Sequence, residues 1–363
     1  MGVNDYDELP PESDRLAPAP HPRDTFQLFG QEKAERELLD AYRSNRAPPA
    51  WIIGGPEGIG KATLAWRLVR FIAAHPDPAA PTVQQARTLA VDPRHPAARR
   101  ISAQSFGDLV LLRREWSDKT KKHATRITVD DVRRAIQMFE QSAGSGGWRM
   151  AIIDSADDFN ANSANAMLKL IEEPPPRSLF LLVAHHPGRI LPTIRSRSRL
   201  LMAERLDPPA LTAAVRAALD AAGHAASEPS LSRACARARG SAREALRLLS
   251  AASGKADELT ARALAQLPKL DWRIAHKIGD AVSGRDSEIE FDAFLCALFD
   301  WLSHCVHRNP GLGPRALAPY AEAWEFLERE ARKLEVYNLD KRAFVIVVFL
   351  RLIDAENAAR AAA

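Results

Sequence analysis

Residues 54–63 read GGPEGIGKAT and directly follow a short apolar run. A glycine-rich turn between a buried strand and a helix lets backbone N–H groups and the helix N-terminus receive a phosphate. Gly55, Gly60 and Lys61 have the spacing of such a phosphate-binding loop, in which the lysine reaches the terminal phosphates. A Ser or Thr, whose hydroxyl would hold Mg²⁺, is expected next, but Ala62 stands there. The loop therefore predicts a phosphate-loop fold more firmly than it predicts activity.

The other polar groups of this stretch predict a degenerate nucleotide site. Gly58 is a further glycine of the loop, and Thr63 carries the nearest hydroxyl. Thr63 lies one position too far along the following helix, about 100° round it from the usual magnesium ligand. The sequence leaves open whether ATP or ADP still binds there.

A second apolar run, RMAIID at 149–154, ends on Asp154. An aspartate at this place in a phosphate-loop protein helps to hold magnesium, although it could also simply end a strand. In hydrolysing proteins with Asp-Glu here, the glutamate activates the attacking water, and this chain has Ser155 instead. A positioned base contributes about 10²–10⁴ in rate, and serine is no base near neutral pH. Ala62 and Ser155 are two losses in one site and predict weak or absent hydrolysis.

Strand-like and helical patterns divide the chain into regions. Continuous apolar runs alternate with amphipathic helices across 26–206, which predicts an α/β domain with a parallel sheet covered on both faces. Strand signals then stop, and the periodicity predicts a small helical domain at 207–253 and a larger one at 254–363. Residues 1–25 hold five prolines and little that could form a core, so we expect a disordered tail.

Composition excludes several classes of protein. The 363 residues are 46% apolar and 26% charged, which is typical of a multidomain globular chain. A net charge of +4 permits a local basic patch but does not by itself indicate nucleic-acid binding. No apolar run approaches the roughly 18 residues of a membrane span, and the acidic, proline-rich start is unlike a secretory signal. The scattered cysteines predict no disulfide framework or structural zinc and fit a reducing cytoplasm: Cys235, Cys296 and Cys305.

Three arginines alternate in TIRSRSRLL at 193–201, at the start of a predicted edge strand. A solvated basic face is the ordinary interpretation of Arg195, Arg197 and Arg199. The other interpretation is an arginine finger, which stabilises charge on a transferring phosphoryl group, sometimes in trans, and is worth about 10³–10⁵ in rate.

Other polar residues allow both a functional and a structural interpretation. Arg243 opens a helix of the second domain, where an arginine could contact nucleotide phosphates or lie on the surface. His185 and His186 follow a strand where a polar sensor would lie, but a structural or solvated role is favoured. Asp157 and Asp158 are too displaced to be a favoured replacement for the missing base.

Two further stretches point to contacts with other molecules. A short basic run could contact DNA phosphates, although a solvated loop is favoured: Lys119, Lys121, Lys122 and Arg126. The stretch FVIVVFLRLI at 344–353 is apolar nearly all round, which predicts a helix buried in a bundle or against a partner.

Three segments together carry a family resemblance: GPEGIGKATLA at 55–65, NANSANAMLKLIEEPP at 160–175 and LPTIRSRSRLL at 191–201. The chain resembles the delta prime subunits of bacterial DNA polymerase III clamp loaders, which are AAA+ proteins. The resemblance covers essentially all of the chain after the predicted tail, and the middle segment is far more specific than a phosphate loop.

The resemblance implies an AAA+ module, a helical lid at 207–253 and a helical collar or oligomerisation domain at 254–363. It implies a ring of five subunits with motor (gamma/tau) subunits and a delta subunit, which opens the sliding clamp and places it on primed DNA. Ser196-Arg197-Ser198 matches the family's Ser-Arg-Cys motif. The resemblance thus makes Arg197 a finger that reaches into the ATP site of a neighbouring motor subunit, in a chain that needs no cofactor itself.

Departures from the family pattern sharpen this interpretation. Many relatives carry a four-cysteine zinc module, but residues 75–110 contain no cysteine, so we expect no zinc, as in the alphaproteobacterial type. Ala62 and Ser155 favour a non-hydrolysing stator over the alternative of a motor subunit in the same ring. An AAA+ branch-migration motor ranks lower, since it would need an intact site and a winged-helix domain, whereas 254–363 predicts long helices without a hairpin.

Overall fold

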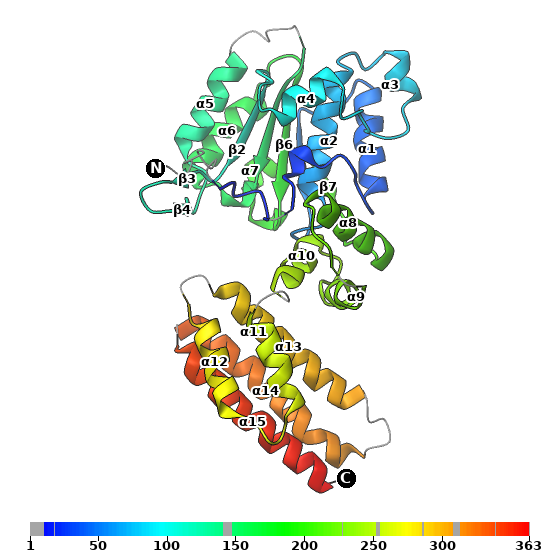
Figure 1. Cartoon of the computed structure of the whole chain (residues 1–363). Coiled ribbons are helices and arrows are strands. Elements are labelled where there is room, and N and C mark those ends of the chain that lie inside the picture. The colour runs from blue at the N-terminus through cyan, green and yellow to red at the C-terminus, as the bar shows by residue number, and fades with distance from the viewer. Residues whose placement is uncertain are drawn as a thin grey trace, which may run out of the picture. The chain divides into compact units, whose positions relative to one another are not determined.

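The computed structural model describes residues 11–17, 19–140, 147–226, 228–251, 255–284, 287–307, 313–337 and 339–362. The chain forms two compact units, Met1–Ala245 and Leu246–Ala363 (Figure 1). The first unit contains the predicted α/β region and most of the predicted lid, and the second is helical. No helix among the described residues is long and apolar enough to cross a membrane.

The first unit is built on a five-stranded sheet in the order β2-β5-β6-β1-β7, and all of its pairs are parallel. The central strand β6 and its neighbour β1 are buried along their whole length, as the continuous apolar runs predicted. This sheet confirms the predicted α/β class. The strands are β1 (Ala50–Gly54), β2 (Leu109–Arg113), β5 (Arg149–Asp154), β6 (Ser178–Ala184) and β7 (Arg199–Met202).

Helices cover both faces of the sheet, because successive side chains of a strand point to opposite sides. In β1, Trp51 and Ile53 join one core with α1 and α2, while Ala50 and Ile52 join the other with α5 and α6. The main helices are α1 (Glu32–Arg43), α2 (Lys61–Ala74), α5 (Val129–Glu140) and α6 (Ala161–Glu172). Shorter elements are α3 (Pro81–Gln85), α4 (Pro96–Ser102), α7 (Pro192–Arg195), η1 (Pro22–Asp24), η2 (Ala156–Asp158), η3 (Pro187–Arg189), β3 (Trp116–Ser117) and β4 (Lys122–His123).

The predicted disordered tail is wrong for residues 11–17 and 19–25, which form an ordered N-terminal strap on the first unit. His21 is only 2% exposed, and its ring contacts Trp66 of α2 edge-on. Arg70 of α2 donates hydrogen bonds to the carbonyls of Arg23 and Thr25, at 2.5 and 2.7 Å. Residues 1–10 and 18, also in the predicted tail, lie outside the described residues.

Buried charges stabilise the strap. Asp14 pairs with His21 at 2.8 Å, and both side chains are almost fully buried. Arg113, at the end of β2, contacts Asp14 at 2.7 Å and Glu12 at 2.8 Å, and Arg23 binds Glu12 through two hydrogen bonds. Burial alone would raise the pKa of Asp14, but His21 and Arg113 outweigh it and lower that pKa. Composition could not predict this order, because it depends on a partner 99 residues away rather than on an apolar core.

The predicted lid consists of three helices: α8 (Pro208–Ala221), α9 (Glu228–Arg237) and α10 (Ala242–Ala251). The boundary between the two compact units falls within α10. The backbone before α10 hydrogen-bonds to the linker after the sheet, from Leu206 N to Gly240 O at 3.1 Å. This bond fixes the start of α10 beside the end of the sheet.

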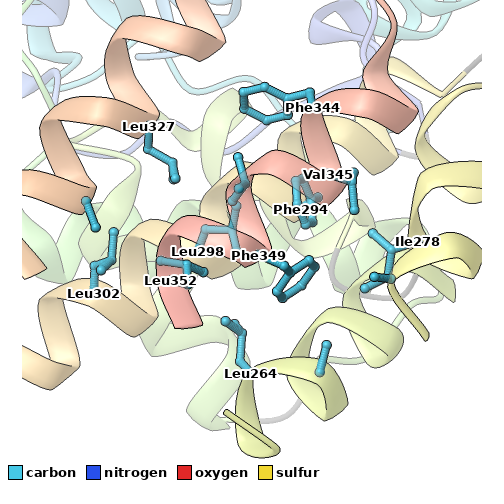
Figure 2. Packing of buried hydrophobic residues seen from close by; sticks show 14 of the residues in the cluster. Leu264, Ile278, Phe294, Leu298, Leu302, Leu327, Phe344, Val345, Phe349 and Leu352 are labelled. Atoms are coloured by element: carbon cyan, nitrogen blue, oxygen red, sulfur yellow. The ribbon is translucent and has the colours of Figure 1, made fainter. Parts of the chain in front are cut away.

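The second unit packs five helices around one apolar core (Figure 2). Phe344, Val345, Phe349 and Leu352 of α15 are buried there, as the apolar run predicted. The described residues of this unit contain no strand, whereas a winged-helix domain contains a β-hairpin. The helices are α11 (Lys255–Ala265), α12 (Trp272–Val282), α13 (Glu288–His307), α14 (Pro314–Tyr337) and α15 (Lys341–Ala362).

Candidate nucleotide site and arginine finger

The phosphate loop connects β1 to α2, as predicted, and its glycines hold positive φ angles. Gly58 has φ +75°, and a Cβ there would lie 2.4 Å from both Ser241 Oγ and Arg243 Cβ of the lid. Gly55 has φ +138°, and its Cβ would lie 2.6 Å from Ala203 O. Glycine is therefore required at both positions, because the backbone is left-handed and the space is filled.

Lys61 turns its charge back onto the loop. The side chain is buried, and Nζ donates a hydrogen bond to the carbonyl oxygen of Pro56. Burial lowers the pKa of Lys61 to about 8, although the carboxylates of Asp154 and Glu57 oppose the shift. A lysine held in this way is not extended toward a bound phosphate.

The lid is joined to the loop through the start of α10. Ser241 Oγ donates to Glu57 O at 2.9 Å, and Ala242 N donates to Gly58 O at 2.8 Å. Arg243 Nε lies 2.9 Å from Glu57 Oε1. We refer to these contacts between 57–58 and 241–243 as the lid latch. The structure thus brings Arg243 to the loop, as the sequence suggested, but pairs it with a loop carboxylate that sequence patterns did not single out.

Asp154 lies at the end of β5 in the same site, close enough to Lys61 for their charges to interact. Burial raises the pKa of Asp154 to about 7, the charge of Asp14 in the strap adds to this rise, and Lys61 opposes it. Ala62 offers no hydroxyl, so the residues present do not fit a magnesium-bound nucleotide.

The carboxylates that follow Asp154 have structural partners. Asp157 accepts hydrogen bonds from Ser155 Oγ and from the backbone N–H groups of His185 and His186, the last at 2.9 Å. Asp158 pairs with Arg114 at 3.1 Å. Neither carboxylate is placed as a replacement for the missing glutamate, which agrees with the sequence interpretation.

His185 belongs to the site more closely than the sequence indicated. Its pKa is lowered by burial and then by the charge of Lys61, so its ring is neutral near pH 7. Its Nδ1 is buried and has no hydrogen-bond partner among the described residues. In the sequence, the position of His185 directly after a predicted strand was the only sign that it lies in the site.

Arg197 lies between α7 and β7 and is exposed. Its Nε pairs with Glu172 Oε1 at 2.8 Å, and its Nη1 donates to Thr193 O and Ser196 Oγ at 3.1 and 3.2 Å. None of these partners belongs to the phosphate loop. Glu172 ends α6 within the segment 160–175 that carries the family resemblance.

The neighbouring arginines differ from Arg197. Arg199 pairs with Glu37 at 2.7 Å and lies over the Trp51 ring at 4.9 Å, so it ties the edge strand to α1 and β1. Arg195 is exposed. The alternating pattern therefore combines side chains with different environments, and only the family motif distinguishes Arg197.

The predicted basic run forms the small hairpin β3–β4. Lys119, Lys121 and Lys122 are exposed, and Lys121 lies 3.5 Å from Asp118. Arg126 donates to Phe159 O at 3.4 Å. These contacts fit the favoured interpretation, a solvated loop. Among the described residues there is no cluster of three or more His, Cys, Asp or Glu side chains that could hold a metal ion.

Comparisons with known proteins agree with this architecture. A family model described as "DNA polymerase III, delta subunit" matches residues 30–207. The delta prime subunit of DNA polymerase III from Pseudomonas aeruginosa is 32% identical over 148 residues, 41% of this chain and 40% of that protein. The chain is therefore similar to clamp-loader subunits of DNA polymerase III, most of all over its first unit.

Other clamp-loader subunits are similar as well. The tau subunit of DNA polymerase III from Escherichia coli is 27% identical over 325 residues, 85% of this chain and 47% of that protein. The matches span less than half the length of these two curated relatives. A gamma subunit-related structure from Thermotoga maritima aligns with a TM-score of 0.41 and 14% identity over 89% of this chain and 99% of that chain.

Proposed function

We propose that this clamp-loader protein is the delta prime subunit: a stator that hydrolyses no ATP itself and donates Arg197 to a neighbouring motor subunit. The proposal rests on one comparison: the partners of the cations in the phosphate loop site differ from the partners of Arg197. Lys61 and Arg243 are held by the loop's own Pro56 and Glu57. Arg197 is exposed and contacts no atom of that loop.

The chain's own site supports a non-hydrolysing role. Ala62 lacks the magnesium-binding hydroxyl, Ser155 replaces the base, and Asp157 is occupied by backbone N–H groups. The lid latch also occupies the loop, because Glu57 and Gly58 are bonded to Ser241, Ala242 and Arg243 of the lid.

Arg197 has the properties that a finger in trans requires. Its partner Glu172 is 44% exposed, and an exposed ion pair of this kind contributes only about 0–1 kcal/mol. A phosphate of a neighbouring subunit can therefore replace Glu172 at little cost. The guanidinium group then stabilises charge on the transferring phosphoryl group.

The helical unit supplies a surface for assembly. Val347 and Leu350 of α15 are 47% and 49% exposed, and both lie on the face away from the buried core residues. Exposed apolar side chains that cluster on one helix face mark contacts between proteins. We propose that this collar joins motor (gamma/tau) and delta subunits in a five-subunit ring. The ring would load the sliding clamp onto primed DNA in the cytoplasm.

A motor subunit of the same ring is the second candidate. The match to the tau subunit, which covers 85% of this chain, favours it. Such a subunit would hydrolyse ATP, so purified protein that turned over ATP at ordinary AAA+ rates would replace the stator proposal with this one.

Reconstitution tests the proposal directly. The chain would be combined with motor and delta subunits, and DNA-dependent ATP hydrolysis would be measured with Arg197→Ala. We expect that the ring still assembles. The ATP site of the motor subunit next to Arg197 should hydrolyse ATP on the order of 10³ times more slowly. Arg195→Ala is the control and should hydrolyse normally. A ring with Arg197→Ala that retained full hydrolysis at every site would reject the finger.

A further inference from the structure

A basic cavity lies between α11 and α12 of the helical unit, outside the part matched by the family model. Its volume is about 570 Å³, within the roughly 300–1,000 Å³ of ligand sites. Three cationic side chains line it: Arg262 of α11, and Arg273 and Lys277 of α12. His276 and Asp271 are the other titratable residues of the described lining. Two helices of one unit thus place cations around a single cavity.

The one carboxylate of this lining does not cancel the positive charge. Asp271 caps α12 and accepts hydrogen bonds from Arg273 N and Nε at 3.0 and 3.2 Å. These bonds, with the charges of Arg273 and Arg262, lower the pKa of Asp271, so its carboxylate is ionised near neutral pH. Arg262 and Lys277 are exposed, and neither forms an ion pair with another residue that the structure describes. Three cations against one carboxylate leave the cavity positively charged, so it attracts anions.

Two features that phosphate and nucleic-acid sites commonly use are missing from the described lining. Phosphate sites at helix N-termini use free backbone N–H groups. At the start of α12, Arg273 N donates to the Asp271 carboxylate, and Ile274 N donates to the Asp271 carbonyl at 2.9 Å. The described lining also contains no phenylalanine, tyrosine or tryptophan on which a base could stack. The cavity therefore holds an anion mainly through its long cationic side chains.

Apolar side chains make up the rest of the described lining. Leu259 of α11 is half-buried and Ile274 of α12 is 6% exposed, whereas the three cations are exposed. The cavity thus has an apolar floor below charged walls. A phosphate chain offers nothing apolar to cover that floor. An acidic peptide offers both parts, because its carboxylates can pair with arginine and lysine while an apolar side chain covers the floor.

We propose that this cavity binds an extended acidic peptide segment of a partner protein, in which apolar side chains alternate with carboxylates. Successive side chains of an extended chain point to opposite sides, so the apolar ones reach Leu259 while the carboxylates stay near the exposed cations. Arg262 and Lys277 come from different helices and pair with these carboxylates, and His276 donates a further hydrogen bond. The proposal does not rest on the role of Arg197, which lies in the other unit.

The test measures fluorescence anisotropy of a labelled hexapeptide that alternates aspartate and leucine, titrated with the full chain. Arg262→Ala with Lys277→Ala should weaken binding about tenfold, because two exposed ion pairs are lost. Arg329→Ala with Lys333→Ala is the control, since it removes the same two charges from α14 of the same unit, and it should bind normally. Circular dichroism checks that each variant is folded.

Other peptides and anions separate the ligand classes. A hexapeptide of asparagine and leucine should not bind, and one of aspartate and serine should bind several times more weakly than the aspartate-leucine peptide. Tripolyphosphate and oligothymidylate, at equal charge concentration, should displace the labelled peptide poorly, whereas the unlabelled peptide should displace it efficiently. Four results would overturn the proposal: no binding by the wild-type chain, equal loss in the two double variants, equal binding of the aspartate-serine peptide, or equal displacement by either phosphate polymer.

Discussion

The phosphate loop and the segment around Arg197 both carry cations to which we assign a proposed role toward ATP, but the two regions hold these cations differently. In the loop, Lys61 donates a hydrogen bond to the carbonyl of Pro56, and Arg243 pairs with the carboxylate of Glu57. Both cations are therefore held by groups of the loop itself. In the other segment, Arg197 is exposed and pairs with one exposed carboxylate, that of Glu172, which lies outside the loop. The comparison teaches that a motif marks ancestry, while the partners of its side chains decide where its chemistry can take place.

Replacing the cations of the two regions by alanine, one at a time, has the largest expected effect on the rate of ATP hydrolysis. In a reconstituted ring, Arg197→Ala should slow hydrolysis at the neighbouring site on the order of 10³. Lys61→Ala should leave ring hydrolysis within about twofold, because this lysine contacts its own loop. Single-turnover hydrolysis of labelled ATP measures both. The opposite order of effects would mean that the loop is the working site.

The next largest effect concerns the lid latch. Gly58→Ala should lower the free energy of unfolding by about 2–3 kcal/mol, since the new Cβ would meet Ser241 and Arg243 at 2.4 Å in a left-handed backbone. Urea denaturation measures this change. Gly107→Ala is the matched control, because nothing lies within 4 Å of its Cβ position, and its effect should be below about 0.5 kcal/mol. Equal effects would argue against a tightly docked lid.

A pH series tests the buried carboxyl group of the loop site. Asp154 has a pKa of about 7 in the folded chain against an ordinary value of 3.8, so the folded state binds the proton more tightly. Stability from this group is therefore lost as pH rises through this window. Asp154→Asn, which does not titrate, should gain about 2–3 kcal/mol relative to the wild type as the pH rises from 5 to 7.5. Thermal denaturation across this range measures the gain, and a constant difference would contradict the assignment.

The smallest effect belongs to the ion pair that crosses the latch. Glu57→Ala should change stability by less than about 1 kcal/mol, because both side chains are partly exposed. It should nevertheless release Arg243 and raise the affinity for ATP severalfold, which calorimetry with the purified chain can detect. Glu37→Ala, which removes the surface partner of Arg199, is the control and should not alter nucleotide affinity. Unchanged affinity in Glu57→Ala would show that Glu57 does not hold Arg243 back.

Local patterns predicted the strands β1, β5 and β6, because each is buried on both faces and reads as a continuous apolar run. They also predicted the loop between β1 and α2, because glycines at left-handed positions leave a sequence signature. The strap was missed, since its order comes from ion pairs with Arg113 and hydrogen bonds from Arg70. Such partners are distant in the chain and leave no periodicity.

The sequence by itself determined the fold class and the resemblance to clamp-loader subunits. It also determined that position 62 lacks a hydroxyl and that position 155 lacks a base, because these features depend on residue type and spacing alone. Only the tertiary structure decided which groups the remaining cations contact. In the folded chain, Lys61 donates a hydrogen bond to Pro56, Arg243 pairs with Glu57, and Arg197 pairs with Glu172. Ion pairs and hydrogen bonds depend on distances of about 3 Å between side chains far apart in the chain, and only folding sets those distances.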